Sequence, residues 1–272
     1  MEHKKIAFIG AGNMVKAIVS GLVAGGYPAK LITATAPSET RRLPLEQQFG
    51  ICTTNDNQQA ATDADVVVLS VKPQMMAEVC KPLQGVDWSN KLVISIAAGI
   101  QSERFNQMLN SQLNLVRVMP NTPSQLGLGM SGLYAPAHVC EQDKAFAAEL
   151  MQACGKVCWV EQESGINNII AAAGSAPAYF FLFMEAMQAE AIAQGFDQQT
   201  ARLLVQQSAL GAASMVVGNP DTDLATLREN VTSKGGTTAE ALRTFNQHQL
   251  SDIVAKAMQA AVARAEEMES LF

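Results

Sequence analysis

The stretch Lys5-Ile6-Ala7-Phe8-Ile9-Gly10-Ala11-Gly12-Asn13-Met14 decides the fold of this chain. Its apolar run is typical of a strand buried in a parallel sheet. Gly10 and Gly12 allow a tight turn and a close approach of the backbone to a pyrophosphate, whose charge then faces the N-terminus of the following helix. Val15 occupies the third position of the pattern, where Gly or Ala is usual, and we expect it to crowd the helix against the strand. A chance glycine turn stays open as the alternative, although its place directly after a strand favours the dinucleotide.

An alternation of strands and helices extends from the N-terminus to about residue 160. Strands this apolar, separated by helices, predict a parallel sheet covered on both faces. The expected strands are Lys5–Ile9, Leu31–Thr35, Val66–Val71, Leu92–Ile96, Leu115–Val118 and Val157–Val160, with helices such as Asn13–Ala24 and Lys144–Cys154 between them.

The loops that follow these strands consist mainly of small or polar residues. Ligands of such sheets bind at the carboxyl ends of the strands, so we expect a ligand along this edge. The loops are Gly10-Ala11-Gly12-Asn13-Met14, Thr35-Ala36-Pro37, Val71-Lys72-Pro73, Ala97-Ala98-Gly99 and Met119-Pro120-Asn121.

The strand pattern stops after Glu161, and the remaining chain is predicted to be all-helical. We therefore expect two domains, residues 1–161 and 162–272, the first binding a dinucleotide. The small-residue face of Ile253–Ala265 favours close helix packing and oligomerisation. The expected helices are Ile166–Gln194, Thr200–Val217, Ala225–Asn230, Thr238–Phe245 and Leu250–Met268.

Composition narrows the function further. The 272 residues are 48% hydrophobic and 16% charged, as in an ordinary globular protein. The net charge of −6, without a run of basic residues, argues against nucleic acid as a partner. The five cysteines form no CxxC pair, and we expect them to be reduced, buried and apolar in a cytoplasmic protein without a signal peptide. The three histidines are scattered, so a metal site has no support.

Gly165–Met184 contains no charged residue and is long enough to span a membrane. Its centre is rich in Ala and Gly, and it includes Asn167, Asn168 and Pro177. We therefore interpret it as a helix buried on most sides, for instance at a subunit interface.

The end of the second expected strand predicts the cofactor. Enzymes that prefer NAD place an acidic residue there, but Thr33–Ser38 contains none. Arg41 and Arg42 follow, and guanidinium groups bind a ribose 2′-phosphate. We expect NADPH, with NADH a weaker cofactor, while a solvated helix face is the alternative role for the two arginines.

Two further residues have open roles. Lys72, at a strand end before a proline, is interpreted as lining the cofactor rather than as catalytic, because no acidic partner is near it in sequence. Asn121, between Pro120 and Pro123, either positions a ligand or belongs to a purely structural turn.

A second glycine-rich turn, Ser233-Lys234-Gly235-Gly236-Thr237-Thr238, lies near the C-terminus. Its consecutive N–H groups and hydroxyls can hold a carboxylate at the start of a helix. A plain helix connection with an N-cap is the alternative.

The chain resembles pyrroline-5-carboxylate reductase over residues 4–268. The motifs that carry the resemblance occur in the family's order, and the last is the most specific. They are Gly10–Met14, Val71–Pro73, Ser95–Ile100, Arg117–Pro123, Gly174–Tyr179 and Leu227–Thr238.

The resemblance implies a Rossmann-type NADPH domain, a helical dimerisation domain, and a homodimer or larger homo-oligomer. It implies reduction of L-1-pyrroline-5-carboxylate to L-proline, the last step of proline biosynthesis. The substrate carboxylate would bind Ser233, Gly235, Gly236 and Thr237, with Thr238 near the ring nitrogen as orienting group or proton relay. The cofactor would contact Thr35, Ala36 and Asn57 at the adenosine end and Ala97, Ala98, Gly99 and Asn230 near the nicotinamide.

Three positions depart from the family pattern. Lys234 replaces the usual proline and adds a charge beside the carboxylate site, Asn167 replaces a common aspartate, and Ala176 replaces Gly or Ser.

Two other functions stay open. A β-hydroxyacid dehydrogenase would carry a lysine on the long helix that opens its second domain, and Ile166–Met184 has none. A non-catalytic NADPH-sensing protein would not need the intact substrate turn.

Overall fold

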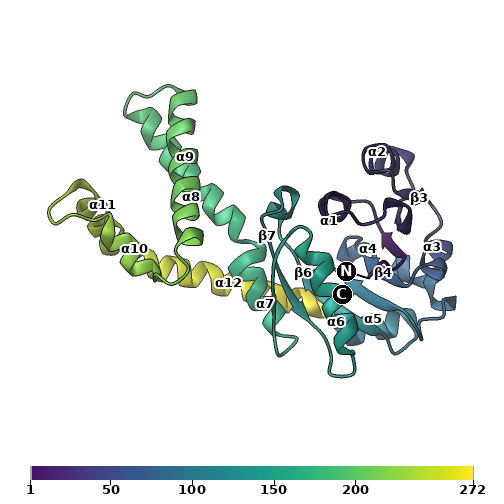
Figure 1. Cartoon of the computed structure of the whole chain (residues 1–272). Helices are drawn as coiled ribbons and strands as arrows, with labels where there is room; N and C mark the ends of the chain where they lie inside the picture. The colour runs from purple at the N-terminus through teal and green to yellow at the C-terminus, as the bar shows by residue number, and fades with distance from the viewer. Residues whose placement is uncertain (1, 272) are drawn as a thin grey trace. The chain divides into compact units, whose positions relative to one another are not determined.

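The computed structural model describes residues 2–271 and divides into two compact units (Figure 1). One, here called the α/β unit, runs to Pro177 and also includes the chain from Ala260 onward. The other, the helical unit, is Ala178–Gln259. The division into these two units differs from the expected boundary between residues 161 and 162. The assignment of residues 1–161 to cofactor binding and 162–272 to substrate binding and oligomerisation stays a prediction.

The α/β unit is built on one eight-stranded sheet in the order β3-β2-β1-β4-β5-β6-β7-β8. Strands β1 to β6 are parallel, which confirms the expected parallel sheet, whereas β7 runs antiparallel to β6 and parallel to β8. The strands are β1 (Ile6–Ile9), β2 (Ile32–Thr35), β3 (Cys52–Thr54), β4 (Val66–Leu69), β5 (Leu92–Ser95), β6 (Asn114–Met119), β7 (Gly129–Tyr134) and β8 (Gly155–Trp159).

Six of these strands match the expected ones to within two residues, and two were missed. β3 is only three residues long and partly exposed, so it has no apolar run. β7 contains Gly132, whose position has no room for a side chain because a Cβ would lie 2.6 Å from the Ile169 side chain. A glycine of this kind lowers the strand signal while allowing close packing.

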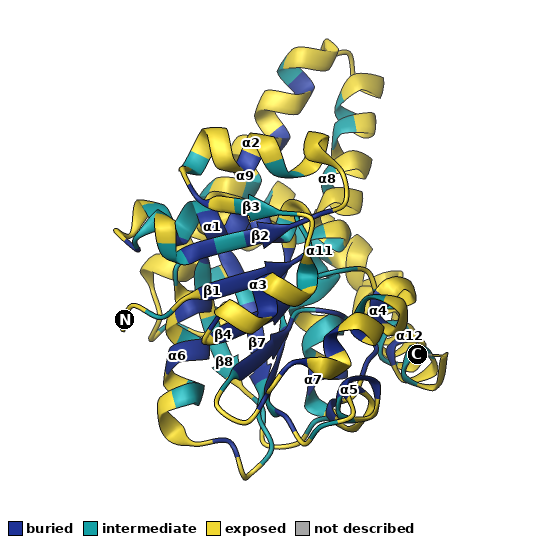
Figure 2. Ribbon diagram, turned by 90° about the vertical axis from the view of Figure 1, so that its right-hand side faces the viewer, coloured by how far each residue is buried: buried dark blue, intermediate teal, exposed yellow. Residues whose placement is uncertain are grey.

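Helices cover both faces of the sheet, and buried residues fill the space beneath them (Figure 2). One core cluster includes Ile18 and Leu150, and Val15 is accommodated within it. The other includes Met76 and Phe105. The helices are α1 (Asn13–Ala24), α2 (Glu39–Phe49), α3 (Asn57–Asp63), α4 (Pro73–Cys80), α5 (Ser102–Leu109), α6 (Glu141–Gln152) and the short α7 (Gly165–Ile169).

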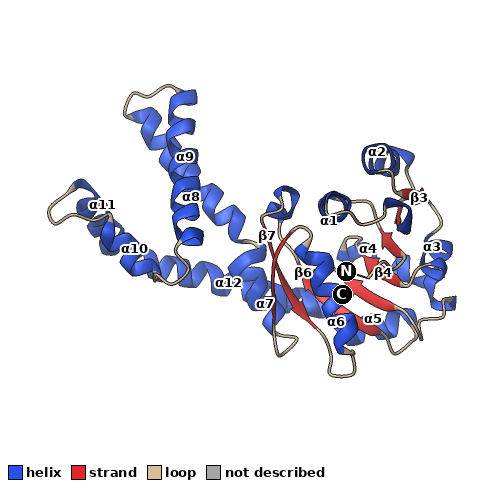
Figure 3. Cartoon of the chain, viewed as in Figure 1, coloured by secondary structure: helices blue, strands red, loops and turns tan. Residues whose placement is uncertain are grey.

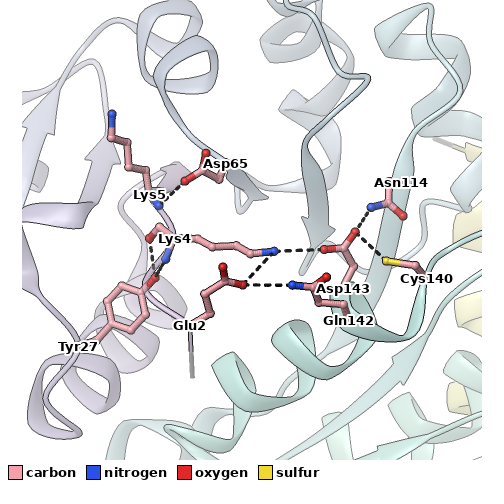
Figure 4. Close-up of polar contacts among 9 residues, drawn as sticks. All are labelled: Glu2, Lys4, Lys5, Tyr27, Asp65, Asn114, Cys140, Gln142 and Asp143. Carbon is pink, nitrogen blue, oxygen red and sulfur yellow. Dashed lines mark hydrogen bonds and ion pairs between the residues drawn. The ribbon is translucent and has the colours of Figure 1, made fainter.

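A polar network fixes the chain just before β1 (Figure 4). The Tyr27 hydroxyl accepts a hydrogen bond from the Lys4 backbone N–H at 2.8 Å, and burial raises the pKa of this phenol. The Lys4 ammonium lies 3.4 Å from a carboxylate oxygen of Asp143 and over the ring of Phe146. Lys5 donates its backbone N–H to Asp65. This network at the amino ends of the strands leaves their carboxyl ends for ligands.

The helical unit contains no strand among its residues, which confirms the all-helical expectation (Figure 3). The expected helix Ile166–Gln194 is interrupted by a π-helical turn at Ile170–Gly174. Side chains of Asp197 and Asp223 cap two of the helices. The helices are α8 (Ala176–Ala193), α9 (Gln198–Gly218), α10 (Leu224–Asn230), α11 (Thr237–Gln247) and α12 (Leu250–Leu271), of which α8 and α12 extend into the α/β unit.

The helical run Gly165–Ala193 is long and apolar enough to cross a membrane by length and composition. Only 6% of its most apolar window is buried within the single chain, so this chain does not itself bury the helix and the expected burial at a subunit interface stays a prediction. Phe180, Phe181 and Leu182 are 62–67% exposed. An apolar surface of this kind marks an interaction site.

The five cysteines differ in exposure, and Cys158 is half-buried. Cys80 and Cys154 are buried, and burial raises the pKa of Cys80 to about 11, so its thiol stays neutral. Cys52 and Cys140 are exposed, which corrects the expectation that all five are buried.

Candidate active site

The predicted cofactor residues of the α/β unit come together at the carboxyl ends of the parallel strands. The chain leaves β1 towards β2 and leaves β4 towards β5, so the connections diverge between β1 and β4, where ligands of such sheets bind. Five loops from distant parts of the sequence therefore share one edge, as expected. They follow β1, β2, β4, β5 and β6.

Gly10 and Gly12 differ in how much room a side chain would have. Gly10 has φ of +125°, and a Cβ there would lie 2.9 Å from the Ser70 carbonyl oxygen. Gly12 is the N-cap of α1, and a Cβ there would meet nothing within 4 Å. No side chain caps α1, so its first N–H groups, starting with that of Asn13, are available to an anion.

Thr35 holds this turn from the neighbouring strand. Its hydroxyl accepts a hydrogen bond from the Gly10 N–H at 3.2 Å and donates one to the side-chain carbonyl of Asn57 at 2.5 Å. Thr35 is only 1% exposed, so its side chain positions the turn rather than offering a surface to a ligand. The half-buried Asn57 begins α3 at the same edge.

The end of β2 is followed by two arginines and two exposed hydroxyl residues. The Arg42 guanidinium lies 3.4 Å from both the Ala36 carbonyl oxygen and the Glu39 carboxylate, so part of its charge is balanced. Arg41 is exposed, and its guanidinium pairs with no residue in the described range 2–271. The exposed hydroxyls of Ser38 and Thr40, which the sequence analysis did not single out, contact each other beside it.

The loop after β4 places Lys72 as the exposed N-cap residue of α4, with Pro73 as the first residue of that helix. The loop after β5 is more enclosed. Ala97 and Gly99 are buried, and Gly99 has φ of +72°. A Cβ on Gly99 would lie 2.9 Å from the Cβ of Met268, so the C-terminal part of α12 supports this loop.

Asn121 serves the fold of the α/β unit. Its side-chain amide donates to the Ala173 carbonyl oxygen at 3.0 Å, and its side-chain oxygen accepts from the Met130 N–H at 2.9 Å. Asn121 is 8% exposed. Both ends of the amide are therefore occupied within the protein, and the structural alternative is the one that the contacts support.

The predicted substrate residues lie together in the helical unit, in the turn between α10 and α11. Gly235 has φ of +71° with open space around it, and Gly236 is the N-cap of α11. The hydroxyls of Ser233, Thr237 and Thr238 make no hydrogen bond to any described residue. The turn thus presents hydroxyls and the N-terminus of an 11-residue helix to solvent.

Thr238 does not cap α11. The cap position belongs to Gly236, two residues earlier, and no side chain makes a capping hydrogen bond there. Thr232 differs from the other hydroxyl residues, because its hydroxyl donates to the Arg228 carbonyl oxygen at 2.6 Å. Asn230 precedes the turn and Lys234 lies within it, and both residues are exposed.

Asn167, a departure from the family pattern, is 2% exposed, and its side-chain oxygen has no hydrogen-bond partner among the described residues. An aspartate here would place a charge in this buried position.

A sizeable pocket of the single chain does not coincide with the predicted cofactor or substrate residues. A pocket of about 630 Å³ lies beside the C-terminal half of α1, and its lining includes His3, Tyr27 and Leu126 but none of the predicted site residues. No group of three or more His, Cys, Asp or Glu residues within 2–271 is arranged to hold a metal ion.

Two family models match the chain, one on each side of its middle. The model described as NADP oxidoreductase, coenzyme F420-dependent, matches residues 5–99, and the model described as pyrroline-5-carboxylate reductase dimerisation matches residues 163–268. A Vibrio alginolyticus protein named pyrroline-5-carboxylate reductase is 85% identical over 272 residues, covering 100% of both chains. The chain belongs to the pyrroline-5-carboxylate reductase family. This confirms the resemblance found in the sequence.

Solved structures agree with this membership. A pyrroline-5-carboxylate reductase from Coxiella burnetii is 41% identical, with a TM-score of 0.92 over 98% of this chain and 99% of that one. The Plasmodium falciparum pyrroline carboxylate reductase, solved with NADP bound, is 27% identical, with a TM-score of 0.87 over 99% of both chains. The family's two-part architecture is therefore the architecture of this chain.

Proposed function

We propose that this protein reduces L-1-pyrroline-5-carboxylate to L-proline with NADPH, the last step of proline biosynthesis. The observation that carries the proposal is the 85% identity over the full length of a protein named for this activity. The two glycine-rich turns supply the matching chemistry, one for a dinucleotide and one for a small carboxylate.

The residues at the sheet edge fit NADPH. The uncapped N-terminus of α1 provides N–H groups for the pyrophosphate, and Gly12 leaves them accessible. Arg41, with the hydroxyls of Ser38 and Thr40, is proposed to provide donors for a 2′-phosphate, whereas the Glu39 carboxylate faces Arg42. Ala97, Ala98 and Gly99 are proposed to line the nicotinamide, and Val71, Lys72 and Pro73 the neighbouring wall. Asn230 is proposed separately as a cofactor-binding residue of the helical unit.

The C-terminal turn fits the substrate. The N–H groups of Gly235 and Gly236 and the hydroxyls of Ser233 and Thr237 are proposed to hold the carboxylate. When bound, NADPH supplies a hydride to the carbon of the protonated C=N bond, whose electron pair moves to nitrogen and gives the ring amine. Thr238 is proposed to hydrogen-bond the ring nitrogen and to orient it, which is the main demand of this chemistry.

We propose a homodimer, or a larger assembly of dimers, formed through the helical unit and located in the cytoplasm. The exposed apolar residues of α8 support this, because a soluble monomer rarely shows so large an apolar surface. A partner copy would also account for the apolar run Gly165–Ala193 without a membrane.

A spectrophotometric assay tests the proposal directly. The purified protein should oxidise NADPH, followed by the absorbance of the reduced nicotinamide, only when L-1-pyrroline-5-carboxylate is present, and proline should accumulate in equal amount. NADPH binding without turnover would instead favour a non-catalytic sensing protein.

A further inference from the structure

One buried arginine and two partly buried glutamates form a cluster of charges that contacts the loop following β5. Arg117 on β6 is 2% exposed, and its Nη1 lies 2.8 Å from Oε1 of Glu163 and 3.7 Å from Oε1 of Glu269. The β5–β6 register pairs Arg117 with Ser95, the last residue of β5. The cation is therefore placed where the Ala97–Gly99 loop begins.

The same two carboxylates hold the far end of this loop. Oε1 of Glu163 accepts hydrogen bonds from the Ser102 N–H at 2.6 Å and from its hydroxyl at 2.8 Å. Oε2 of Glu269 accepts one from the Gln101 side chain at 2.9 Å. One guanidinium thus fixes both acids that bind the residues following Gly99.

Residues 268 and 269 of α12 act on the loop together. The Met268 side chain fills the place where Gly99 would carry a Cβ, and Glu269 binds Gln101. Both residues lie within the α/β unit, although more than 160 positions separate them from the loop in sequence. β5 therefore fixes the start of the Ala97–Gly99 loop. Arg117, through Glu163 and Glu269, fixes the residues at its end, Gln101 and Ser102.

We propose that Arg117, acting through Glu163 and Glu269, is a positioning residue that fixes the Ala97–Gly99 loop for the nicotinamide of the cofactor. The proposal rests on the proposed function for the identity of the group that the loop lines. Its physical basis is independent of that function. A buried cation needs its carboxylates, and both carboxylates also accept hydrogen bonds from the loop's exit, Glu163 from Ser102 and Glu269 from Gln101.

The α12 helix offers a matched pair of variants. Glu269→Gln removes the charge that faces Arg117 while keeping an amide able to contact Gln101. Glu267→Gln makes the same chemical change two residues away, in an exposed pair with Arg264 where both side chains are 59% exposed. Arg117→Lys keeps the buried charge but replaces the guanidinium, whose Nη1 contacts both carboxylates, with a more strongly hydrated ammonium on a different stem.

Hydrogen exchange of the Ser102 amide reports on the loop without any assay, because this N–H donates directly to Glu163. We expect Glu269→Gln and Arg117→Lys to speed exchange across residues 98–102 about tenfold, with the core strands unchanged. The same variants should weaken NADPH binding about fivefold by calorimetry and raise its KM, with kcat for bound substrate within about twofold of wild type. Glu267→Gln should match wild type in every measurement.

The proposal is overturned if exchange at 98–102 and NADPH affinity stay at wild-type values in both variants. It is also overturned if exchange rises equally throughout the sheet, since the cluster would then serve only overall stability. Wild-type protein that fails to reduce the imine would refute the proposed function, whereas the exchange result would still decide whether Arg117 fixes the loop.

Discussion

The dinucleotide turn of the α/β unit and the Ser233–Thr238 turn of the helical unit both depend on glycine, for different reasons. Gly10 is required by the protein itself, because Ser70 occupies the space where a side chain would go. Gly235 has only open space around it, and the hydroxyls beside it have no partner in the described chain. Contacts within the protein therefore fix the conformation of the first turn. The second turn leaves its N–H and hydroxyl donors exposed to solvent.

The largest expected effect concerns the surface of the helical unit. Phe181→Glu places a charge on the apolar face of α8 and should weaken self-association more than about 100-fold, because a charge in an apolar interface lacks a partner. Light scattering at a series of protein concentrations gives the molar mass and hence the dissociation constant of the assembly. Lys256→Glu on the exposed part of α12 is the control. An active monomer at micromolar concentration in wild type would refute the dimer.

Thr238→Ala tests the substrate turn. If its hydroxyl orients the ring nitrogen, kcat should fall roughly 100-fold, while NADPH affinity stays near wild type. The melting temperature should change little because Thr238 does not cap α11. Thr238→Ser should retain most of the activity. Unchanged kcat in the alanine variant would remove Thr238 from the mechanism.

Gly10→Ala and Gly12→Ala separate packing from binding in the dinucleotide turn. Gly10→Ala should destabilise the protein by about 1–3 kcal/mol, because it meets Ser70 and strains a backbone with φ of +125°. Gly12→Ala should leave stability within about 1 kcal/mol of wild type. Both should weaken NADPH binding. Thermal melts with calorimetric titration give the two quantities, and equal destabilisation by both changes would contradict the distinction.

Arg41→Ala should produce the smallest effect, on cofactor choice alone. Loss of one charge-assisted contact to a 2′-phosphate should lower kcat/KM for NADPH about tenfold and leave the value for NADH unchanged. Arg42→Ala should lower kcat/KM for NADPH less than Arg41→Ala does, since Glu39 balances part of the Arg42 charge. Equal kcat/KM for both cofactors in wild type would show that the end of β2 does not select NADPH.

The strands that pass through the core were predictable because their apolar runs leave a strong local pattern. β7 was not predictable, because Gly132 interrupts its apolar pattern. Gly132 packs against the Ile169 side chain, and this contact cannot be read from the sequence. Asn121 shows the same limit within the site. Spacing left its role open between ligand binding and structure, and only its partners at Ala173 and Met130 favour structure.

The sequence by itself determined the dinucleotide turn, the change from mixed to all-helical chain and the family, because each depends on local pattern and residue order. Only the tertiary structure decided that Thr35 supports Gly10 from a buried position, that Arg41 rather than Arg42 is unpaired within 2–271, and that Met268 and Glu269 lie against the loop after β5. These relations join residues far apart in the chain. They arise when packing brings buried polar groups together and each must find a partner.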